Sequence, residues 1–193
     1  MTRIGFVRHG TTAWNTAKRA QGHSDIPLDK NGLSEAEKLA NRLGKEDWDV
    51  LYSSDLERAK QTAEAIGKYC NMQVHVDKRL RERSGGQIEG TTEAERLTKW
   101  GVDWRALDLG MENEASIVDR GFAFLKEVVN KHPDDNILIV THGAFIKHLL
   151  RALIPHADEP IEAIRNTSIS CLDQTVDGWN LDLFNCTKHL VES

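Results

Sequence analysis

The sequence has few of the features that mark proteins that bind nucleic acids or membrane surfaces. It holds 25 lysine and arginine residues against 30 aspartate and glutamate residues, which gives a formal net charge of −5, and it contains no basic run. Such a chain is poorly suited to bind a nucleic-acid backbone or an anionic membrane. We therefore expect neither partner and expect a small solute instead.

Long apolar runs and patterned cysteines are also lacking. No stretch approaches the ~20 apolar residues of a membrane span, and the first residues, MTRIGFV, show no charged region followed by a long apolar region. Cys70, Cys171 and Cys186 are odd in number and irregularly spaced, which is typical of reduced thiols rather than a disulfide framework. These absences predict a cytoplasmic protein.

The length and composition indicate one globular unit. A chain of 193 residues with 39% hydrophobic content is long enough to bury a core of its own. No internal repeat, low-complexity tract or linker interrupts it. We expect a single domain over residues 1–193, working as a monomer or a homodimer.

Short apolar runs alternate with helical patterns along the chain. Residues 3–8, 49–53 and 137–141 are nearly continuous apolar runs, as expected of strands that are covered on both faces. Apolar residues at helical spacing follow each run, within residues 33–43, 56–66 and 146–153. This alternation predicts an α/β fold, a three-layer α/β/α sandwich around a mostly parallel central sheet.

Local signals mark helix starts and a hairpin. A hydroxyl residue with a glutamate three places on, the pattern of a capping box, occurs at three predicted helix starts: Ser34 with Glu37, Ser54 with Glu57, and Thr92 with Glu95. Asp177-Gly178 separates two strand-like segments, which predicts a hairpin at the C-terminal edge of the sheet.

Two histidines stand at predicted strand ends. His9 follows the first strand by one residue, and His142-Gly143 follows the run that ends at Thr141. Functional groups of open α/β sheets gather at the carboxyl ends of the strands, so the two imidazoles face each other if these strands are neighbours. Gly143 would let a ligand approach the N–H groups of a helix start, which predicts an anion site. Either histidine alone is equally well explained as an ordinary polar residue.

Two arginines strengthen the functional interpretation. Arg58 lies in the first turn of a predicted helix, where the dipole disfavours a cation by roughly 0.3 to 1 kcal/mol. Arg8 adjoins His9, and two guanidinium forks are suited to hold a phosphoryl group from several sides. Ion pairs with Glu57 or Asp55 are the alternative for Arg58 taken by itself.

Several motifs resemble the histidine phosphatase superfamily, also called the phosphoglycerate mutase-like proteins. They are "RHGTTAWN", "QGHSDIPLDKNGLSEAEKLA", "LYSSDLERAKQTA", "LRERSGGQIEG" and "ILIVTHGA", in family order from residue 3 to about 170. The resemblance implies a nucleophile at His9, a proton donor at Glu82, and four side chains that bind the phosphoryl group: Arg8, Asn15, Arg58 and His142. Three positions depart from the family pattern without touching this set: Thr11, Ile88 and Asn113.

Weaker signals concern the substrate side. Gln21-Gly22 resembles the substrate-side turn of the family, and an ordinary glycine turn is the alternative. We expect residues 83–115 to form a lid or insertion. Trp100 and Trp104 within it either wall a substrate pocket or simply pack at helical spacing.

These residues predict a metal-independent phosphomonoesterase without a cofactor. A neutral imidazole can attack phosphorus and give a phosphohistidine, while fixed donors stabilise the charge that a metal would otherwise carry. Glu82 would protonate the leaving alkoxide, and Glu89 is its competitor for this role. The remaining histidines show no zinc-ligand spacing.

Two other functions stay open. A phosphoglycerate mutase would return the phosphoryl group to the substrate, but mutases of the family usually carry a longer insertion than residues 91–111. A phospho-ligand binding module that has lost catalysis is the second alternative, and the presence of every expected catalytic residue argues against it.

Overall fold

A single six-stranded sheet organises the protein. The computed structural model describes residues 1–155, 161 and 163–191. Its strands occur in the order β3-β2-β4-β1-β5-β6 across the sheet. Their bounds are β1 Arg3–Arg8, β2 Val50–Ser53, β3 Val74–Val76, β4 Asn136–Thr141, β5 Ile169–Thr175 and β6 Gly178–Cys186.

The sheet is parallel on one side and antiparallel on the other. Strand β4 pairs in parallel with both β1 and β2, and β2 pairs in parallel with β3. Strand β5 runs antiparallel to β1, and β5 and β6 form the predicted hairpin, with its turn at residues 176–177, one residue before the predicted Asp177-Gly178 pair. Three strands predicted from apolar runs therefore lie side by side in the centre as β1, β4 and β2.

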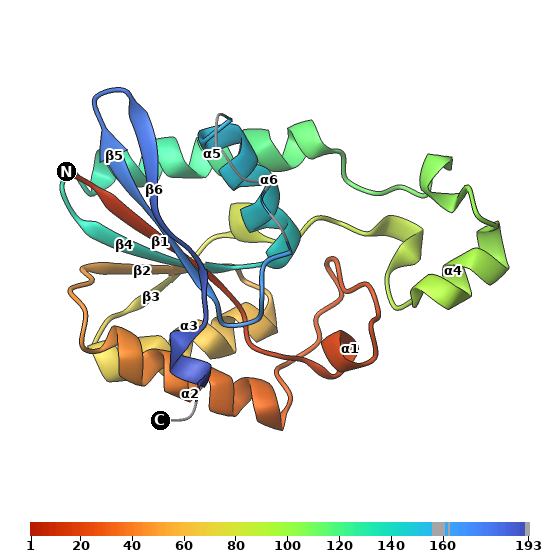
Figure 1. The fold of residues 1–193 in the computed structure, drawn as a ribbon, viewed down its shortest axis with the longest axis horizontal. Helices are drawn as coiled ribbons and strands as arrows, with labels where there is room; N and C mark the ends of the chain where they lie inside the picture. The colour runs from red at the N-terminus through yellow and green to blue at the C-terminus, as the bar shows by residue number, and fades with distance from the viewer. Residues whose placement is uncertain (156–160, 162, 192–193) are drawn as a thin grey trace.

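Helices cover both faces of this sheet, which confirms the predicted three-layer architecture. Helices α2 and α3 lie on one face, and α5 and α6 lie on the other (Figure 1). Each interface holds a buried apolar cluster, one including Leu39, Ala63 and Val140, the other Phe124, Phe145 and Ile139. The helix bounds are α1 Ala13–Thr16, α2 Lys30–Leu43, α3 Glu57–Cys70, α4 Glu93–Trp100, α5 Glu114–Lys131 and α6 Gly143–Leu153.

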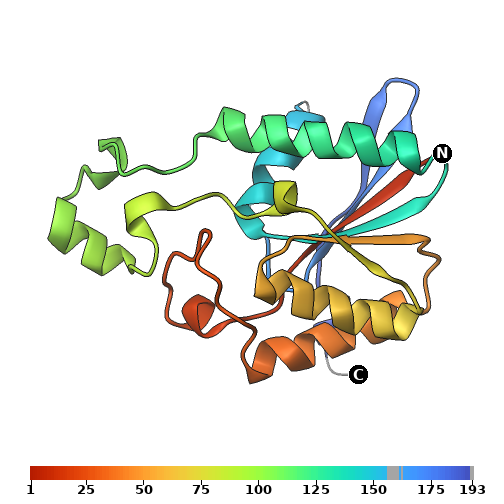
Figure 2. The same ribbon diagram turned by 180° about the vertical axis from the view of Figure 1, so that it is seen from behind.

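One segment extends away from the sandwich. The chain between residues 83 and 113 leaves the carboxyl edge of the sheet, forms α4 at its far end, and returns to the start of α5 (Figures 1 and 2). This segment lies within the predicted lid or insertion. None of the helices in the described part of the chain is long and apolar enough to cross a membrane.

Two of the three predicted helix caps are wrong. Asp29 caps α2, and its side chain accepts from the Gly32 N–H at 2.8 Å, so Ser34 lies inside the helix. Helix α3 begins after Leu56 without a side-chain cap. The predicted capping box of Thr92 and Glu95 is present at α4. A carboxylate earlier in the chain thus replaces the hydroxyl at α2, since an anion also suits the positive end of the helix.

Strand β3 and helix α5 are not among the elements predicted from the sequence. Strand β3 is three residues long and mostly exposed, so it leaves almost no apolar pattern. Helix α5 buries Ile117, Phe124, Leu125 and Val128 at helical spacing. That spacing is the signal from which this helix could have been found.

The start of α2 packs tightly against the turn after β1, and this contact generates a prediction for stability. A Cβ on Gly32 would lie 2.0 Å from the Thr11 carbonyl oxygen. We expect Gly32→Ala to lower the free energy of unfolding by about 1 to 3 kcal/mol, the usual cost of overpacking, although alanine favours helix. Urea titration measures this change.

Gly44→Ala at the other end of α2 is the matched control. Gly44 has a φ of −65°, and a Cβ there would meet its nearest neighbour at 3.4 Å. Its substitution should leave stability unchanged or raise it by up to ~1 kcal/mol. Equal unfolding midpoints for the two variants would show that the α2 contact imposes no constraint.

Candidate active site

The central strand pair brings the two predicted histidines together. Strands β1 and β4 are neighbours, and Arg8 lies opposite Thr141 in their register. His9 and His142 follow directly, and their ring centroids are 5.2 Å apart at an interplanar angle of 58°. Their exposed fractions are 2% and 0%. The two strands are therefore adjacent, which is the condition for the predicted contact between the two imidazoles.

The environment of His9 leaves one ring nitrogen free to act. Its Nδ1 lies 2.7 Å from the Gly10 carbonyl oxygen, and because a carbonyl only accepts, Nδ1 carries the proton. Burial, followed by the positive charges of Arg58 and Arg8, lowers the pKa of His9 well below its usual value. The ring is therefore neutral at ordinary pH and keeps the lone pair of Nε2.

His142 occupies the N-cap position of α6. Its Nε2 lies 2.9 Å from Ser54 Oγ. Burial and the charge of Arg58 lower the pKa of His142 well below its usual value. Its Nδ1 is buried and has no hydrogen-bond partner among the described residues.

Arg58 is fully buried at the start of α3. It donates through Nη1 to the Ser24 carbonyl and through Nη2 to the Gly22 carbonyl, both at 2.8 Å. The alternative of ion pairs with Glu57 or Asp55 is not seen. Burial lowers the pKa of Arg58 to about 10, so the group remains a cation.

Arg8 borders the same space from the end of β1. Its Nη1 donates to the Ile164 carbonyl oxygen at 2.6 Å, and burial lowers its pKa. A Cβ on Gly143 would come within 3.3 Å of Arg8 Nε, so this glycine gives the guanidinium room. The Nε atoms of Arg8 and Arg58 are buried without partners in the part of the chain that the structure describes.

Glu82 reaches the N-terminus of α6. Its Oε1 accepts from the Phe145 N–H at 3.0 Å and the Arg83 N–H at 2.9 Å, and its Oε2 accepts from the Ala144 N–H at 3.2 Å. The anion at this helix start is thus a carboxylate of the protein itself. The negative charge of Glu82 acts favourably on both Arg8 and Arg58.

The substrate-side residues approach the histidines through hydrogen-bond chains. Asn15 Oδ1 accepts from the Thr12 N–H at 3.1 Å and from Asn166 Nδ2 at 3.3 Å, and Asn166 also donates to the His9 carbonyl at 3.0 Å. Gln21 Oε1 accepts from Thr12 Oγ1 at 3.0 Å. With its oxygen engaged, Asn15 can offer only its amide N–H groups to a ligand.

The backbone conformation at position 22 requires a glycine. It has a φ of +50°, and a Cβ there would overlap Glu89. Its carbonyl accepts from Arg58. The Gln21-Gly22 turn therefore holds a phosphate-binding candidate in place, and it differs from an ordinary glycine turn in this respect.

Glu89, the alternative acid, is held as a structural carboxylate. It accepts from the His23 and Ser24 N–H groups, from Ser24 Oγ and from the Gly85 N–H, at 2.7 to 2.9 Å. Burial opposes its ionisation, but these hydrogen bonds prevail and lower the pKa of Glu89. A carboxyl group whose pKa is lowered in this way is a poor proton donor.

Three residues near the site are not among the predicted site residues. Ser54 contacts His142, Asn166 contacts His9 and Asn15, and Thr62 Oγ1 accepts from the Gly10 N–H at 3.1 Å. Ser54 is visible in the sequence only as a helix cap, and Asn166 follows no strand or motif. Their roles depend on contacts over long sequence separations, which local patterns do not report.

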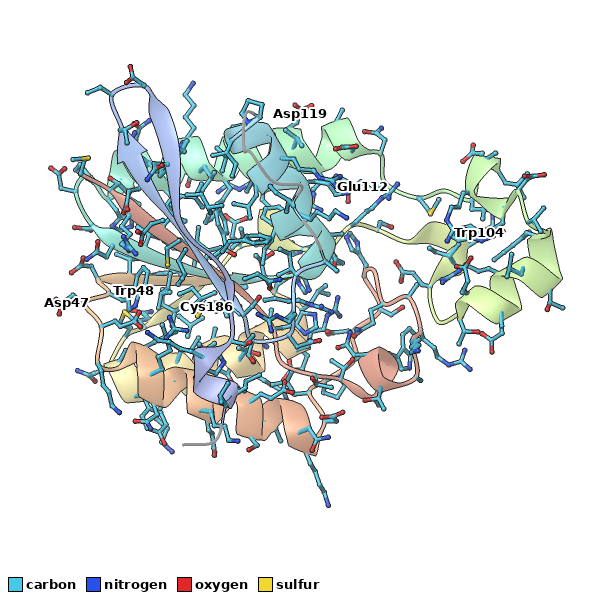
Figure 3. All side chains as sticks on the ribbon, in the orientation of Figure 1. Asp47, Trp48, Trp104, Glu112, Asp119 and Cys186 are labelled. Carbon is cyan, nitrogen blue, oxygen red and sulfur yellow. The ribbon has the colours of Figure 1, made fainter. Side chains whose placement is uncertain are left out.

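The tryptophans of the projecting segment differ in their surroundings. Trp104 is buried between the guanidinium groups of Arg96 and Arg105, and its indole N–H donates to Glu93 at 3.1 Å. Figure 3 shows it within the projecting segment. Trp104 therefore packs inside the projecting segment and does not form a wall of a substrate pocket. Trp100 is half-buried, with Lys99 Nζ 4.4 Å from its ring centroid.

The assembled groups suit a tetrahedral anion. A neutral imidazole nitrogen, two guanidinium groups and a second imidazole gather at the carboxyl ends of β1 and β4 and the start of α3, and three of their nitrogens lack partners in the described chain. Among the described residues, no group of three or more His, Cys, Asp or Glu side chains could hold a metal ion. The arrangement can bind a phosphoryl group and attack it.

Comparison with known proteins gives a consistent result. The model of the histidine phosphatase superfamily (branch 1) matches residues 4–187. Two Arabidopsis thaliana proteins, phosphoglycerate mutase-like protein 4 and a metal-independent phosphoserine phosphatase, are 34% and 33% identical, over 98% of this chain and 87% and 84% of theirs. A mycobacterial glucosyl-3-phosphoglycerate phosphatase solved with VO3 is 30% identical, with a TM-score of 0.86 over 95% of this chain and 98% of that one.

The buried charges around His9 generate a prediction for its titration. Because Arg58 opposes protonation of His9, Arg58→Met should raise the pKa of His9 while burial still holds it below the usual value. NMR titration of the imidazole nitrogens measures this change. Arg81→Met is the control, since Arg81 pairs with Asp55 instead. An unchanged titration in Arg58→Met would contradict the assigned electrostatics.

Proposed function

The chain belongs to the histidine phosphatase superfamily, and on this premise we propose that it is a metal-independent phosphomonoesterase that hydrolyses small phosphorylated metabolites through a phosphohistidine on His9. One observation carries the proposal. His9 is buried and neutral, with its Nε2 free beside Arg8, Arg58 and His142. This is the state that an imidazole nucleophile needs.

The first step transfers the phosphoryl group to the protein. The lone pair of His9 Nε2 forms a bond to phosphorus as the bond to the ester oxygen breaks in line with it. In this proposal Glu82 enters the step protonated, gives its proton to the departing alkoxide and is left as a carboxylate. In the second step Glu82 accepts a proton from water, the water oxygen attacks phosphorus, and the bond to His9 breaks to release inorganic phosphate.

Fixed donors stabilise the charge of both steps. The transition state spreads negative charge over three equatorial oxygens. Arg8, Arg58, His142 and Asn15 would bind these oxygens, and the buried Nε atoms of both arginines and Nδ1 of His142 support this role because nothing in the described chain satisfies them. Backbone carbonyls already hold both guanidinium groups in place, so little reorganisation is needed during the reaction. No metal is required for this chemistry.

Residues 83–115 would act as a lid or insertion that selects the substrate within a single domain of residues 1–193. Candidate substrates include phosphoserine and glucosyl-3-phosphoglycerate, after the relatives and structures named above. A panel of phosphorylated metabolites measures this selectivity. We further expect a cytoplasmic location, where free thiols such as Cys171 stay reduced.

A phosphoglycerate mutase is the second candidate, and the relative named phosphoglycerate mutase-like protein 4 favours it. Retention of the phosphoryl group requires an enclosed site that excludes water. The short segment of residues 91–111 argues for hydrolysis instead. Rapid interconversion of 2- and 3-phosphoglycerate without release of inorganic phosphate would support the mutase.

His9→Ala tests the nucleophile. We expect it to abolish turnover, and wild-type protein quenched during turnover should carry an acid-labile, base-stable phosphate on His9. Mass spectrometry after rapid quench locates the phosphate. Label on a serine, aspartate or cysteine would refute the proposed intermediate, and binding of substrate without any turnover would support a non-catalytic binding module.

Glu82→Gln tests the proton donor. We expect single-turnover cleavage of an alkyl phosphate to slow by roughly 10²- to 10⁴-fold, the range of general acid catalysis. Phosphohistidine formation from an activated aryl phosphate should change far less, because its leaving group departs as a stable anion.

Glu89→Gln provides the comparison for this test. Glu89 accepts from the N–H groups of His23 and Ser24. Glu89→Gln should therefore slow the cleavage of both substrates by similar factors. A loss that depends on the leaving group in Glu89→Gln, and not in Glu82→Gln, would reverse the two assignments.

A further inference from the structure

Arg120, in the second turn of α5, uses its entire hydrogen-bonding capacity on the segment that carries Glu82. Its Nη1 donates to the Arg79 carbonyl at 2.6 Å and the Arg81 carbonyl at 2.7 Å. Its Nη2 donates to the Glu82 carbonyl at 3.2 Å and to Glu112 Oε2 at 3.0 Å, and its Nε donates to Glu112 Oε1 at 2.8 Å. A guanidinium has five N–H donors, and all five are engaged.

Arg120 also contacts the helix end that receives the Glu82 carboxylate. Its guanidinium lies 5.0 Å from the centre of the Phe145 ring. The backbone N–H of Phe145 donates to Glu82 Oε1 at 3.0 Å. One side chain thus touches both the backbone of Glu82 and the residue that binds its carboxylate.

Glu112 completes this arrangement where the projecting segment returns to the body (Figure 3). Its carboxylate pairs with Arg120 and accepts from the Ser84 N–H at 3.2 Å, while its carbonyl accepts from Arg83 Nε at 2.7 Å. Burial opposes ionisation, but the bonds from Arg120 and Ser84 lower the pKa of Glu112. A charged pair therefore holds the chain on both sides of Glu82.

We propose that Arg120, held by Glu112, is a positioning residue that sets the place of the Glu82 carboxyl group at the N-terminus of α6. This inference rests on the proposed role of Glu82 as proton donor. It assigns Arg120 no contact with substrate. Its consequence is that a change at Arg120 affects proton transfer to the leaving group more than attack by His9.

Lysine cannot replace arginine in this position. An ammonium group has three donors and no planar fork, whereas Arg120 serves three carbonyls and both oxygens of Glu112. Arg120→Lys keeps the positive charge while it frees part of the Glu82 segment. A displacement on the order of 1 Å from the productive geometry can slow a reaction by about 10²-fold.

The test compares two substrates in single-turnover experiments. Arg120→Lys should slow cleavage of an alkyl phosphate by about 10- to 100-fold and leave phosphohistidine formation from an activated aryl phosphate nearly unchanged. Arg79→Lys is the matched control, because Arg79 likewise pairs with carboxylates and lies over a phenylalanine ring, that of Phe124. Equal losses on both substrates in Arg120→Lys would overturn the proposal.

The double variant Glu82→Gln/Arg120→Lys gives a second readout. If Arg120 acts through Glu82, the double variant should cleave the alkyl phosphate no more slowly than Glu82→Gln alone, because residues that act as a unit are not additive. Losses that multiply would show that Arg120 acts elsewhere.

A folding defect has its own control. Thermal unfolding shows whether each variant is folded at the assay temperature. If Arg120→Lys is unfolded there, Glu112→Gln replaces it in the test, and we expect the same dependence on the leaving group. If wild type shows no phosphohistidine, the proposed function fails. If wild type and Glu82→Gln behave as proposed but neither Arg120→Lys nor Glu112→Gln distinguishes the substrates, only the positioning role fails.

Discussion

The burial of two imidazoles beside two guanidinium groups is the constraint on which the rest of the site depends. His9, His142 and Arg58 are almost fully removed from solvent at the carboxyl ends of β1 and β4 and the start of α3, with Arg8 alongside. Charges are costly to bury. The histidines meet this cost by remaining neutral, and the arginines meet it through backbone carbonyls and the nearby charge of Glu82. The space between them is therefore short of negative charge, which a phosphoryl group supplies.

Two carboxylates seven residues apart illustrate how position determines chemistry. Among the described residues, Glu82 accepts hydrogen bonds from backbone N–H groups, two of which lie in the first turn of α6. His142 occupies the N-cap position of the same helix. Glu89 is bound by the turn whose carbonyls hold Arg58. Glu89 thus helps to orient Arg58, a candidate for phosphate binding, and it does so as a carboxylate. Of the two, Glu82 is the one that lies at the helix start next to His142, which is the position that the proposed function requires of a proton donor.

The sequence predicts the parts of this site that lie at element boundaries. His9, His142 and Arg58 are readable because strand ends and helix starts are local features, and β1 and β4 are neighbours as their apolar runs allow. Ser54, Asn166 and Arg120 are not readable, because their contacts with His142, with His9 and with the Arg81 carbonyl span 88, 157 and 39 residues of the chain. Even the cap of α2 is misassigned, since Asp29 and Ser34 both fit local propensity and it is Asp29 whose side chain accepts from the Gly32 N–H.

The projecting segment is held differently along its length. It has packing of its own around Trp104, and Arg19 ties α4 to the turn after α1 through Glu95 at 2.7 and 2.9 Å. Its two ends, by contrast, are fixed to the sandwich by the Glu112 and Arg120 pair beside Glu82. Under the proposed function, changes near α4 would therefore alter the surface that meets a leaving group more readily than the position of Glu82. Of the four phosphate-binding candidates, Arg8, Arg58 and His142 come from the sandwich, whereas Asn15 lies in α1, next to the turn that Arg19 ties to α4.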